Sequence, residues 1–199
     1  MQKSYDHALV DFLARAENVR FAIEVGERVG LIKAQLGQKF WNLVKQELAN
    51  QLAREKLDSA WRIEDLFLEK GPLNEYAGLI LQPRATGDLL GVAVQIEQGR
   101  LFYSVRRVGD IYQASELASV GRLRSLMEED KFVVKHNKTF VGWNRLEVWV
   151  NGPDFFEDVA RGNVDRIADA ADPVIGLLKN YLPLIEAANH EISALKGNS

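Results

Sequence analysis

The stretch Leu89–Arg107 constrains the fold of this chain more than any other. It contains two apolar runs on either side of Gln98-Gly99. A two-residue loop with glycine in its second place is typical of a tight β-hairpin, because glycine accepts the positive φ that the turn requires. With these two residues as the loop, Glu97 lies opposite Arg100, where the two charges can form a favourable cross-strand pair.

The predicted hairpin has one apolar face and one mixed face, because successive side chains of a strand point to opposite sides. The apolar face carries Leu90, Val92, Val94, Ile96, Leu101, Tyr103 and Val105. The mixed face carries Gly91, Gln95, Glu97, Arg100, Phe102, Ser104 and Arg106. A slip of one residue would move two arginines into the core, so the register is strongly specified. We therefore expect Val94→Asp to destabilise the fold severely and Gln95→Asp to be nearly neutral.

Composition excludes several classes of protein. The 199 residues include no cysteine, which excludes disulfides, thiolate metal sites and cysteine nucleophiles and fits a reducing cytosol. The formal net charge of −3 does not favour a general nucleic-acid or membrane binder. No run of about 18 apolar residues could span a membrane, and the N-terminal stretch does not resemble a secretory signal. We expect a cytoplasmic protein that does not bind membranes.

Residues 1–57 are predicted to be helical. The segment Val19–Val25 is ambiguous, because its apolar residues alternate as in a strand while its Arg, Ala and Glu residues favour a helix. We favour the helix. Gly26 and Gly30 are expected to break or loosen the chain, and a long helix is predicted over Leu31–Leu57 from its apolar stripe.

Residues 61–150 are predicted to form a sheet with one inserted helix. The stretch Trp61–Leu68 is either a strand or a helix end, and Tyr76–Gln82 is a central strand because both of its faces are apolar. After the hairpin we expect a helix over Ile111–Glu129, then short strands at Phe132–Val134 and Thr139–Val141, and a longer strand over Asn144–Val150.

Residues 153–196 are predicted to be helical again. Asp154 and Asn163 are candidate caps of two successive helices, with Gly162 where a glycine often ends the first. Asp172-Pro173 is either a kink or a new helix start, and Pro183 is expected to bend the helix. This order predicts a single α+β domain, an antiparallel meander of about five or six strands packed against the N- and C-terminal helices. Those terminal helices should pack on each other or on a second copy in a homodimer.

Part of the chain resembles a known family. The features concerned are Lys39-Phe40-Trp41 on a long helix, the hairpin sequence GVAVQIEQGRLFYSV, the strand Trp143–Val150 and the helical tail DRIADAADPVIGLLKNYLPLI. Over roughly Leu31–Ile185 this order is similar to the non-catalytic C-terminal region of some PD-(D/E)XK nuclease superfamily proteins of bacteria and phages. The resemblance implies a setting in phage defence or DNA processing.

No catalytic residue follows from this resemblance. The superfamily needs a metal-binding Asp, followed about one strand later by Glu-x-Lys. Asp88 and Glu97 lie at adjacent strand ends, but Gly99 stands where the lysine would be. Glu129-Asp130-Lys131 has the spacing, but it follows a predicted helix rather than a strand. We predict no nuclease activity, and an enzyme with an unfamiliar site is the least favoured class.

The histidines do not indicate a metal site. His7, His136 and His190 are far apart in the sequence, and none has a second ligand at metal-binding spacing. We find neither a nucleophile elbow nor a glycine-rich phosphate loop. We therefore predict no metal and no cofactor.

The best candidate for a binding surface is the outer face of the sheet, where cations and aromatic residues are mixed. The predicted binding residues are Arg100, Phe102, Arg106, Arg107, Arg145 and Trp149, with Lys135 and Lys138 nearby. Such a mixture suits a protein hot spot or a track for single-stranded nucleic acid. The plainer alternative is an ordinary solvated face, with Phe102 and Trp149 covered by a helix.

These residues lead to two hypotheses on function. The first is a non-enzymatic protein-binding module or inhibitor with a protein partner, acting in phage–host conflict or defence. The alternative is a nucleic-acid-binding accessory module of a nuclease or restriction system.

Overall fold

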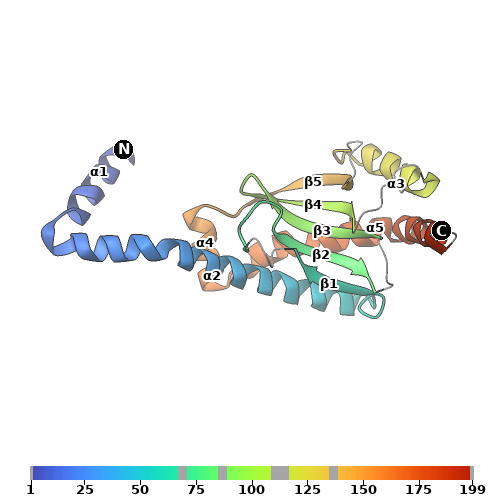
Figure 1. Ribbon diagram of the computed structural model, residues 1–199, viewed down its shortest axis with the longest axis horizontal. Helices are drawn as coiled ribbons and strands as arrows, with labels where there is room; N and C mark the ends of the chain where they lie inside the picture. The colour runs from blue at the N-terminus through green and yellow to red at the C-terminus, as the bar shows by residue number, and fades with distance from the viewer. Residues whose placement is uncertain (1, 67–70, 85–88, 109–116, 135–138, 198–199) are drawn as a thin grey trace.

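The computed structural model describes residues 2–66, 71–84, 89–108, 117–134 and 139–197. It has the predicted α+β class, with five helices and a five-stranded antiparallel meander (Figure 1). The elements, in chain order, are α1 (Gln2–Leu13), α2 (Ala16–Arg54), β1 (Trp61–Asp65), β2 (Gly78–Pro83), β3 (Leu90–Glu97), β4 (Arg100–Arg107), α3 (Ala118–Glu129), β5 (Phe140–Trp149), α4 (Pro153–Arg161) and α5 (Val164–Gly197).

The sheet follows the order of the chain, and the central hairpin has the predicted register. The strand order is β1-β2-β3-β4-β5, with every neighbouring pair antiparallel. Glu97 lies opposite Arg100. Gln98 has φ 54° and Gly99 has φ 74°, and positive φ at both turn residues is what a twist-matched two-residue hairpin requires.

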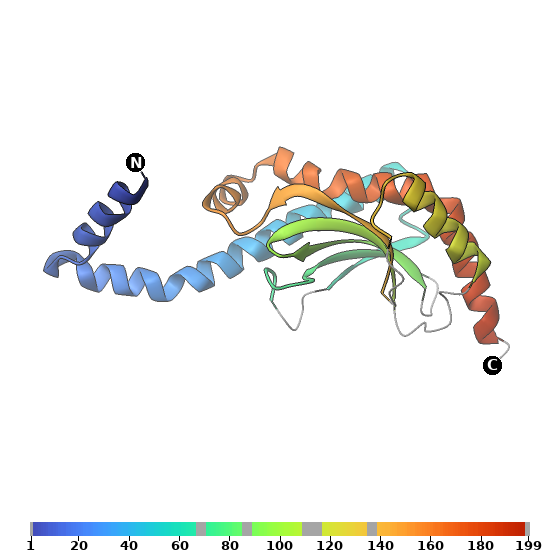
Figure 2. The ribbon, with the colours of Figure 1, turned by 90° about the horizontal axis from the view of Figure 1, so that it is seen from above.

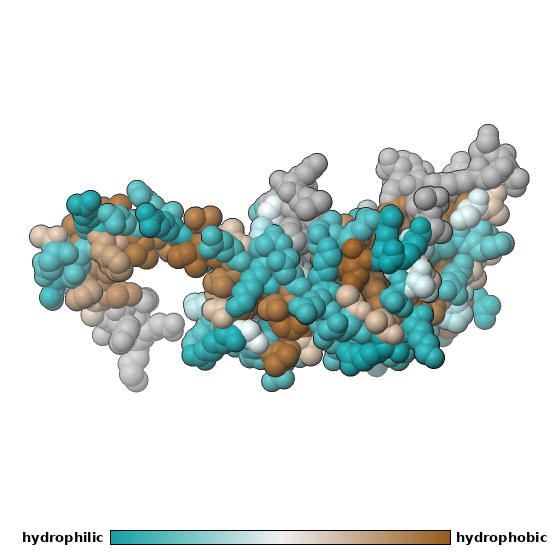
Figure 3. Space-filling model, turned by 90° about the horizontal axis from the view of Figure 1, so that it is seen from below, coloured by the Kyte–Doolittle hydropathy of each residue, from teal (hydrophilic) through white to brown (hydrophobic). Residues whose placement is uncertain are grey.

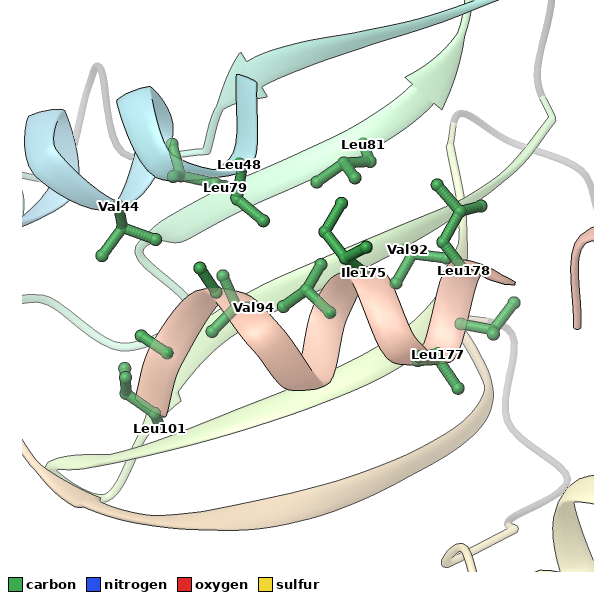
Figure 4. Close-up of a cluster of buried hydrophobic side chains, with 14 of the residues drawn as sticks. Val44, Leu48, Leu79, Leu81, Val92, Val94, Leu101, Ile175, Leu177 and Leu178 are labelled. Atoms are coloured by element: carbon green, nitrogen blue, oxygen red, sulfur yellow. The ribbon is translucent and has the colours of Figure 1, made fainter. Parts of the chain in front are cut away.

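The core lies between one face of the sheet and a layer made by α5 and the second half of α2 (Figures 1 and 2). Figure 4 shows how these elements meet. Its labelled side chains are Val44 and Leu48 from α2, Leu79 and Leu81 from β2, Val92 and Val94 from β3, Leu101 from β4, and Ile175, Leu177 and Leu178 from α5. Burial of these apolar stripes is the main source of stability for such a layer.

The local signals for the C-terminal helices are confirmed at Gly162 and Asn163 but not at Asp154. Helix α4 begins at Pro153, its N-cap residue is Gly152, and no side chain caps it. Proline is well tolerated at the start of a helix, because its missing amide hydrogen is not needed there. Gly162 ends α4 in the left-handed conformation, with φ 71°. The Asn163 Oδ1 atom then accepts a hydrogen bond of 3.1 Å from the Asp165 amide, which caps α5. Helix α5 passes through Pro173 and Pro183 as one helix and bends along its length (Figure 2).

Several sequence predictions on the elements were wrong in their boundaries. Helix α2 starts at Ala16 and continues through Gly26 and Gly30, so the favoured helix over 19–25 is confirmed but the break after it is not. A glycine inside a helix costs only about 1 kcal/mol relative to alanine, which does not end a helix by itself.

The predicted strands near the end of the sheet are also revised. Phe140–Trp149 is one strand, and Val133 makes only an isolated bridge to Trp143. Helix α3 begins at Ala118, later than predicted, and the first part of the predicted helix (111–116) lies outside the described residues. Lys135, His136 and Lys138 lie outside them as well.

The N-terminal helices do not all pack against the sheet or against α5. Residues 2–32, which we call the arm, comprise α1 and the first part of α2 and project beyond the rest of the molecule, the body (Figures 1 and 2). Contact with the body is close at Gly37, where a Cβ atom would lie 2.7 Å from the Leu73 side chain. Farther along, α2 and α5 are joined by the ion pair Lys179–Glu55, 2.7 Å long. None of the described helices combines the length and apolar character that crossing a membrane requires.

Candidate binding surface

The predicted binding residues, with one exception, lie on the outer face, which we define as the sheet face opposite α2 and α5. Figure 2 shows that the sheet curves and that the helices cover its convex side, so the outer face is concave. The side chains of this face come mainly from alternate residues of β3, β4 and β5, because successive side chains of a strand point to opposite faces. The residues that form its aromatic and charged centre are Tyr76, Gln95, Arg100, Phe102, Arg106, Phe140, Trp143, Arg145 and Trp149.

Phe102 occupies the centre of the outer face but presents almost no surface. Its side chain is only 3% exposed. Its ring makes edge-to-face contacts with Tyr76, Phe140 and Trp143, at centroid distances of 6.4, 5.7 and 6.1 Å. Phe102 is therefore covered by other aromatic side chains of the same face rather than by a helix. Its role is to hold those rings in place rather than to contact a ligand directly.

Two arginines of the outer face are neutralised by glutamates of the same face. Arg145 lies 3.2 Å from Glu97, and Arg100 forms an ion pair with Glu147. Glu97 and Arg100 lie opposite each other as predicted, but they do not form an ion pair with each other. Glu97 pairs with Arg145 of β5, and Arg100 pairs with Glu147 of β5. Strand β5 lies on the other side of β4 and brings Arg145 and Glu147 within reach. The charges of these two arginines are therefore balanced within the face.

The same arginines also lie over aromatic rings. The Arg100 guanidinium carbon is 5.5 Å from the centroid of the Trp149 ring, and that of Arg145 is 5.7 Å from the Trp143 ring. A cation is attracted to the face of an aromatic ring, and Arg and Trp are both enriched at the hot spots of protein interfaces. Trp149 remains 53% exposed and Tyr76 47% exposed. These two side chains are the large apolar surfaces that a ligand would meet.

Arg106 differs from its neighbours. Its Nη1 atom donates a 2.9 Å hydrogen bond to Gln95 Oε1, and its guanidinium lies 5.7 Å from the Phe140 ring centroid. Burial lowers the pKa of Arg106, although an arginine stays charged at neutral pH. Within the described part of the chain, no carboxylate forms an ion pair with it. Arg106 is therefore a half-buried cation that an incoming acidic or carbonyl oxygen could bind.

The placement of Arg107 on the outer face was wrong. Arg107 lies opposite Leu90, on the core side of β4, and is only 3% exposed. The reason is the alternation of the strand, because Arg106 and Arg107 are consecutive and must point to opposite faces. Burial, and then the charge of Arg124, lowers the pKa of Arg107. Arg107 is removed from the candidate surface.

Tyr76, Gln95, Phe140 and Trp143 were not predicted as binding residues. Trp143 could have been found from the sequence, because it is two residues from Arg145 and shares its face. Tyr76 lies before β2, and its position next to Phe102 depends on tertiary structure. Gln95 is 1% exposed and donates a 2.8 Å hydrogen bond to the Tyr76 carbonyl, so it is a buried link and not the tolerant surface residue that we expected.

Among the described residues, neither a metal-binding cluster nor a pocket with unpaired carboxylates suggests another functional site. Among them, no three His, Asp or Glu side chains are grouped so that they could hold a metal ion. A pocket between α2 and α5 contains carboxylates, but each of them already has a partner. Gln51 donates to Glu47 and Asp172 at 2.8 and 2.6 Å, Arg54 pairs with Glu47, and Lys179 pairs with Glu55. This pocket is therefore a structural network that joins the two helices.

Comparisons of the chain with protein-family models, with curated proteins and with solved structures found no match.

Proposed function

We propose that this protein is a non-enzymatic protein-binding module or inhibitor whose contact surface is the outer face around Trp149. The observation that supports this proposal is the charge balance of that face. Two of its three arginines are paired with glutamates of the same face, while Trp149 and Tyr76 stay exposed beside them.

Charge balance favours a protein partner over nucleic acid. Affinity for a nucleic-acid backbone comes from cations that are free to neutralise phosphates. On this face, Glu97 and Glu147 would lie against the phosphates that Arg145 and Arg100 approach. Protein hot spots instead combine Trp, Tyr and Arg in a desolvated centre with a polar rim. The resemblance noted in the sequence supports a setting in phage–host conflict for such a module.

A second candidate function is favoured by Arg106. A guanidinium with no carboxylate partner among the described residues, next to the Phe140 ring, is the kind of group that could bind one phosphate while a base stacks nearby. This observation supports the nucleic-acid-binding accessory module as the alternative.

The first experiment is capture of a partner from host lysate with the full-length chain as bait, with and without nuclease treatment. We expect a protein that remains bound after nuclease treatment and is lost with Trp149→Ala. The matched control is Val164→Ala, which removes an exposed apolar side chain from the start of α5, away from the outer face. Equal capture by both variants would contradict the proposed surface.

The second experiment separates the two functions by salt. Binding of DNA and RNA oligomers is measured at low and moderate salt, for the native chain and for Arg106→Ala. A complex that neutralises several phosphates weakens steeply with salt, whereas one made by buried aromatic side chains does not. Tight, salt-sensitive binding that is lost in Arg106→Ala would establish the accessory-module function and overturn the first.

A further inference from the structure

The arm exposes an unusual amount of apolar surface. Of fifteen large hydrophobic side chains that are exposed among the described residues, ten belong to it (Figure 3). They are Leu9, Val10, Phe12, Val19, Phe21, Ile23, Val25, Val29, Leu31 and Ile32. Single exposed hydrophobic residues are normal, but a continuous group of this size marks an interaction surface.

The arm cannot be a stable helix pair without a partner. Its part of α2 is rich in β-branched residues and contains Gly26 and Gly30, all of which have low helix propensity. Most helical stability in proteins comes from packing of an apolar face and not from propensity. Helix α1 gives little of that packing, because it diverges from α2 beyond the connecting turn (Figures 1 and 2). At the turn itself, Asn18 Nδ2 donates a 2.9 Å hydrogen bond to the Phe12 carbonyl.

The spacing of the apolar residues on the arm's part of α2 indicates that two other helices pack against it. One apolar series has alternating spacings of three and four residues, which is typical of the contact face of a helix that packs against another helix. It consists of Ala22, Val25, Val29 and Ile32. A second series with the same alternation, Val19, Ile23, Gly26 and Gly30, lies on an adjacent side. A helix that is apolar on two sides is buried between other helices.

We propose that the arm pairs with the arm of a second copy of this chain. Two α1–α2 pairs then form a four-helix arrangement, with the two α2 helices antiparallel. An isologous pairing of this kind closes at the dimer, because each copy uses the same surface. The antiparallel direction places the two bodies at opposite ends of the paired arms. This interface does not include the outer face and is independent of the function proposed for it.

The charges of the arm suit a second copy better than other partners. Over residues 2–32 the sequence has five acidic residues (Asp6, Asp11, Glu17, Glu24 and Glu27) interspersed with four basic ones (Lys3, Arg15, Arg20 and Arg28). Such a balanced surface does not repel its own copy. A helix that lies on an anionic membrane carries mainly Lys and Arg on its polar face, and a nucleic-acid surface is also basic. The arm has neither pattern.

The apolar area is also of the size that a stable dimer needs. From the exposed fractions of the ten side chains, each arm offers on the order of 900 Å² of apolar residue surface, and a standard protein interface buries about 800 Å² per partner. The exposed apolar surface of one arm is therefore comparable in area to one side of a standard interface.

The test is the mass of the full-length chain in solution, by sedimentation and light scattering over a range of concentrations. We expect twice the chain mass of 22.4 kDa for the native chain and a single chain mass for the double variant Val25→Glu, Val29→Glu. Val164→Glu is the matched control, since it places the same charge on an exposed valine of the body and should leave the dimer intact. All four tryptophans lie in the body, so an unchanged tryptophan emission shows that the double variant is folded there.

The direction is tested with a spin label, because the chain has no cysteine of its own. A label on Arg15→Cys, at the tip of the arm, should give a distance between copies of at least about 25 Å, since some 17 helical residues of each arm separate the tips at 1.5 Å per residue. A short distance between the two labels would show parallel arms and overturn the antiparallel arrangement.

Three other outcomes would overturn the dimer. One is a native chain that is monomeric at about 100 μM, where a dimer of micromolar affinity would be largely formed. Another is a dimer that persists in the double variant. The third is a monomer that binds anionic lipid vesicles, or a different protein, through the arm.

Discussion

The side-chain amide of Asn189, in α5, pairs with the backbone of Leu90, in β3, as a neighbouring strand would. Its Oδ1 atom accepts a hydrogen bond of 2.6 Å from the Leu90 amide, and its Nδ2 atom donates one of 3.1 Å to the Leu90 carbonyl. The register pairs Leu81 with Val92, so the residue opposite Leu90 on β2 would be Pro83. Proline has no amide hydrogen to donate to Leu90. Asn189, in the helix layer, therefore supplies the hydrogen bonds that a residue of a neighbouring strand would form with the Leu90 backbone.

The first prediction is that Asn189→Ala lowers the free energy of unfolding by about 2–6 kcal/mol, because two buried backbone groups lose their partner at roughly 1–3 kcal/mol each. Urea denaturation followed by tryptophan fluorescence measures the loss. Asn42→Ala, at an exposed asparagine of α2, is the control and should change stability by less than about 0.5 kcal/mol. Equal midpoints for the two variants would show that the Asn189 pairing is not important.

The second prediction concerns Gln95, which links the Tyr76 carbonyl to Arg106. Gln95→Ala should destabilise the fold by about 1–3 kcal/mol, since the Tyr76 carbonyl and the Arg106 Nη1 atom both lose their hydrogen bond to the Gln95 side chain. Gln46→Ala, on the exposed side of α2, should be nearly neutral. A double-mutant cycle with Arg106→Ala should show coupling between Gln95 and Arg106, and strictly additive losses would contradict a direct link.

The hairpin could be predicted from the sequence because its signals are local. The turn Gln98-Gly99 and the alternation on either side of it determine which residues face each other, and the observed register agrees at all eight pairs from Leu90–Arg107 to Glu97–Arg100. Gly162 and Asn163 acted in the same way at the junction of α4 and α5. In each case the deciding atoms lie within a few residues of each other.

The outer face was predicted only in part, because its character depends on distant segments. Phe102 is buried by Tyr76, Phe140 and Trp143, which come from other parts of the chain. Arg145 finds its partner Glu97 on β3, across the intervening strand β4. The alternation of a single strand predicts which side a residue faces, but it does not predict whether that side is covered.

The third prediction compares two glycines. At Gly78, in β2, a Cβ atom would lie 2.0 Å from the Val94 carbonyl oxygen, which belongs to the rigid backbone of β3. Gly78→Ala should therefore destabilise severely, by about 3 kcal/mol or more, because the strands must move apart. Gly121, inside α3, has open space where its Cβ would be, so Gly121→Ala should stabilise by about 0.5–1 kcal/mol. Thermal midpoints that shift in the same direction for both variants would contradict this pair of predictions.

Tyr181 joins the middle of α5 to the end of α3. Its hydroxyl donates a hydrogen bond to the Asp130 carboxylate, and its ring makes an edge-to-face contact with Phe132 at 6.2 Å. Burial, and then the hydrogen bond and negative charge of Asp130, raise the pKa of Tyr181 well above its ordinary value. The folded protein therefore holds the phenol proton more tightly than the unfolded chain does.

The last prediction is the pH dependence that follows. Stabilisation from the neutral Tyr181 hydroxyl is fully present below the unfolded pKa of about 10, and it is lost as pH rises from there towards the folded pKa, by up to about 1.4 kcal/mol per pH unit. We expect the free energy of unfolding of the native chain to fall more steeply between about pH 9 and 11 than that of Tyr181→Phe, which has no phenol proton to lose at this position. Tyr76→Phe, at an exposed tyrosine, is the control and should keep the native slope. The measurement is urea denaturation across that pH range, and equal slopes for all three chains would mean that Tyr181 does not stabilise the fold through its proton.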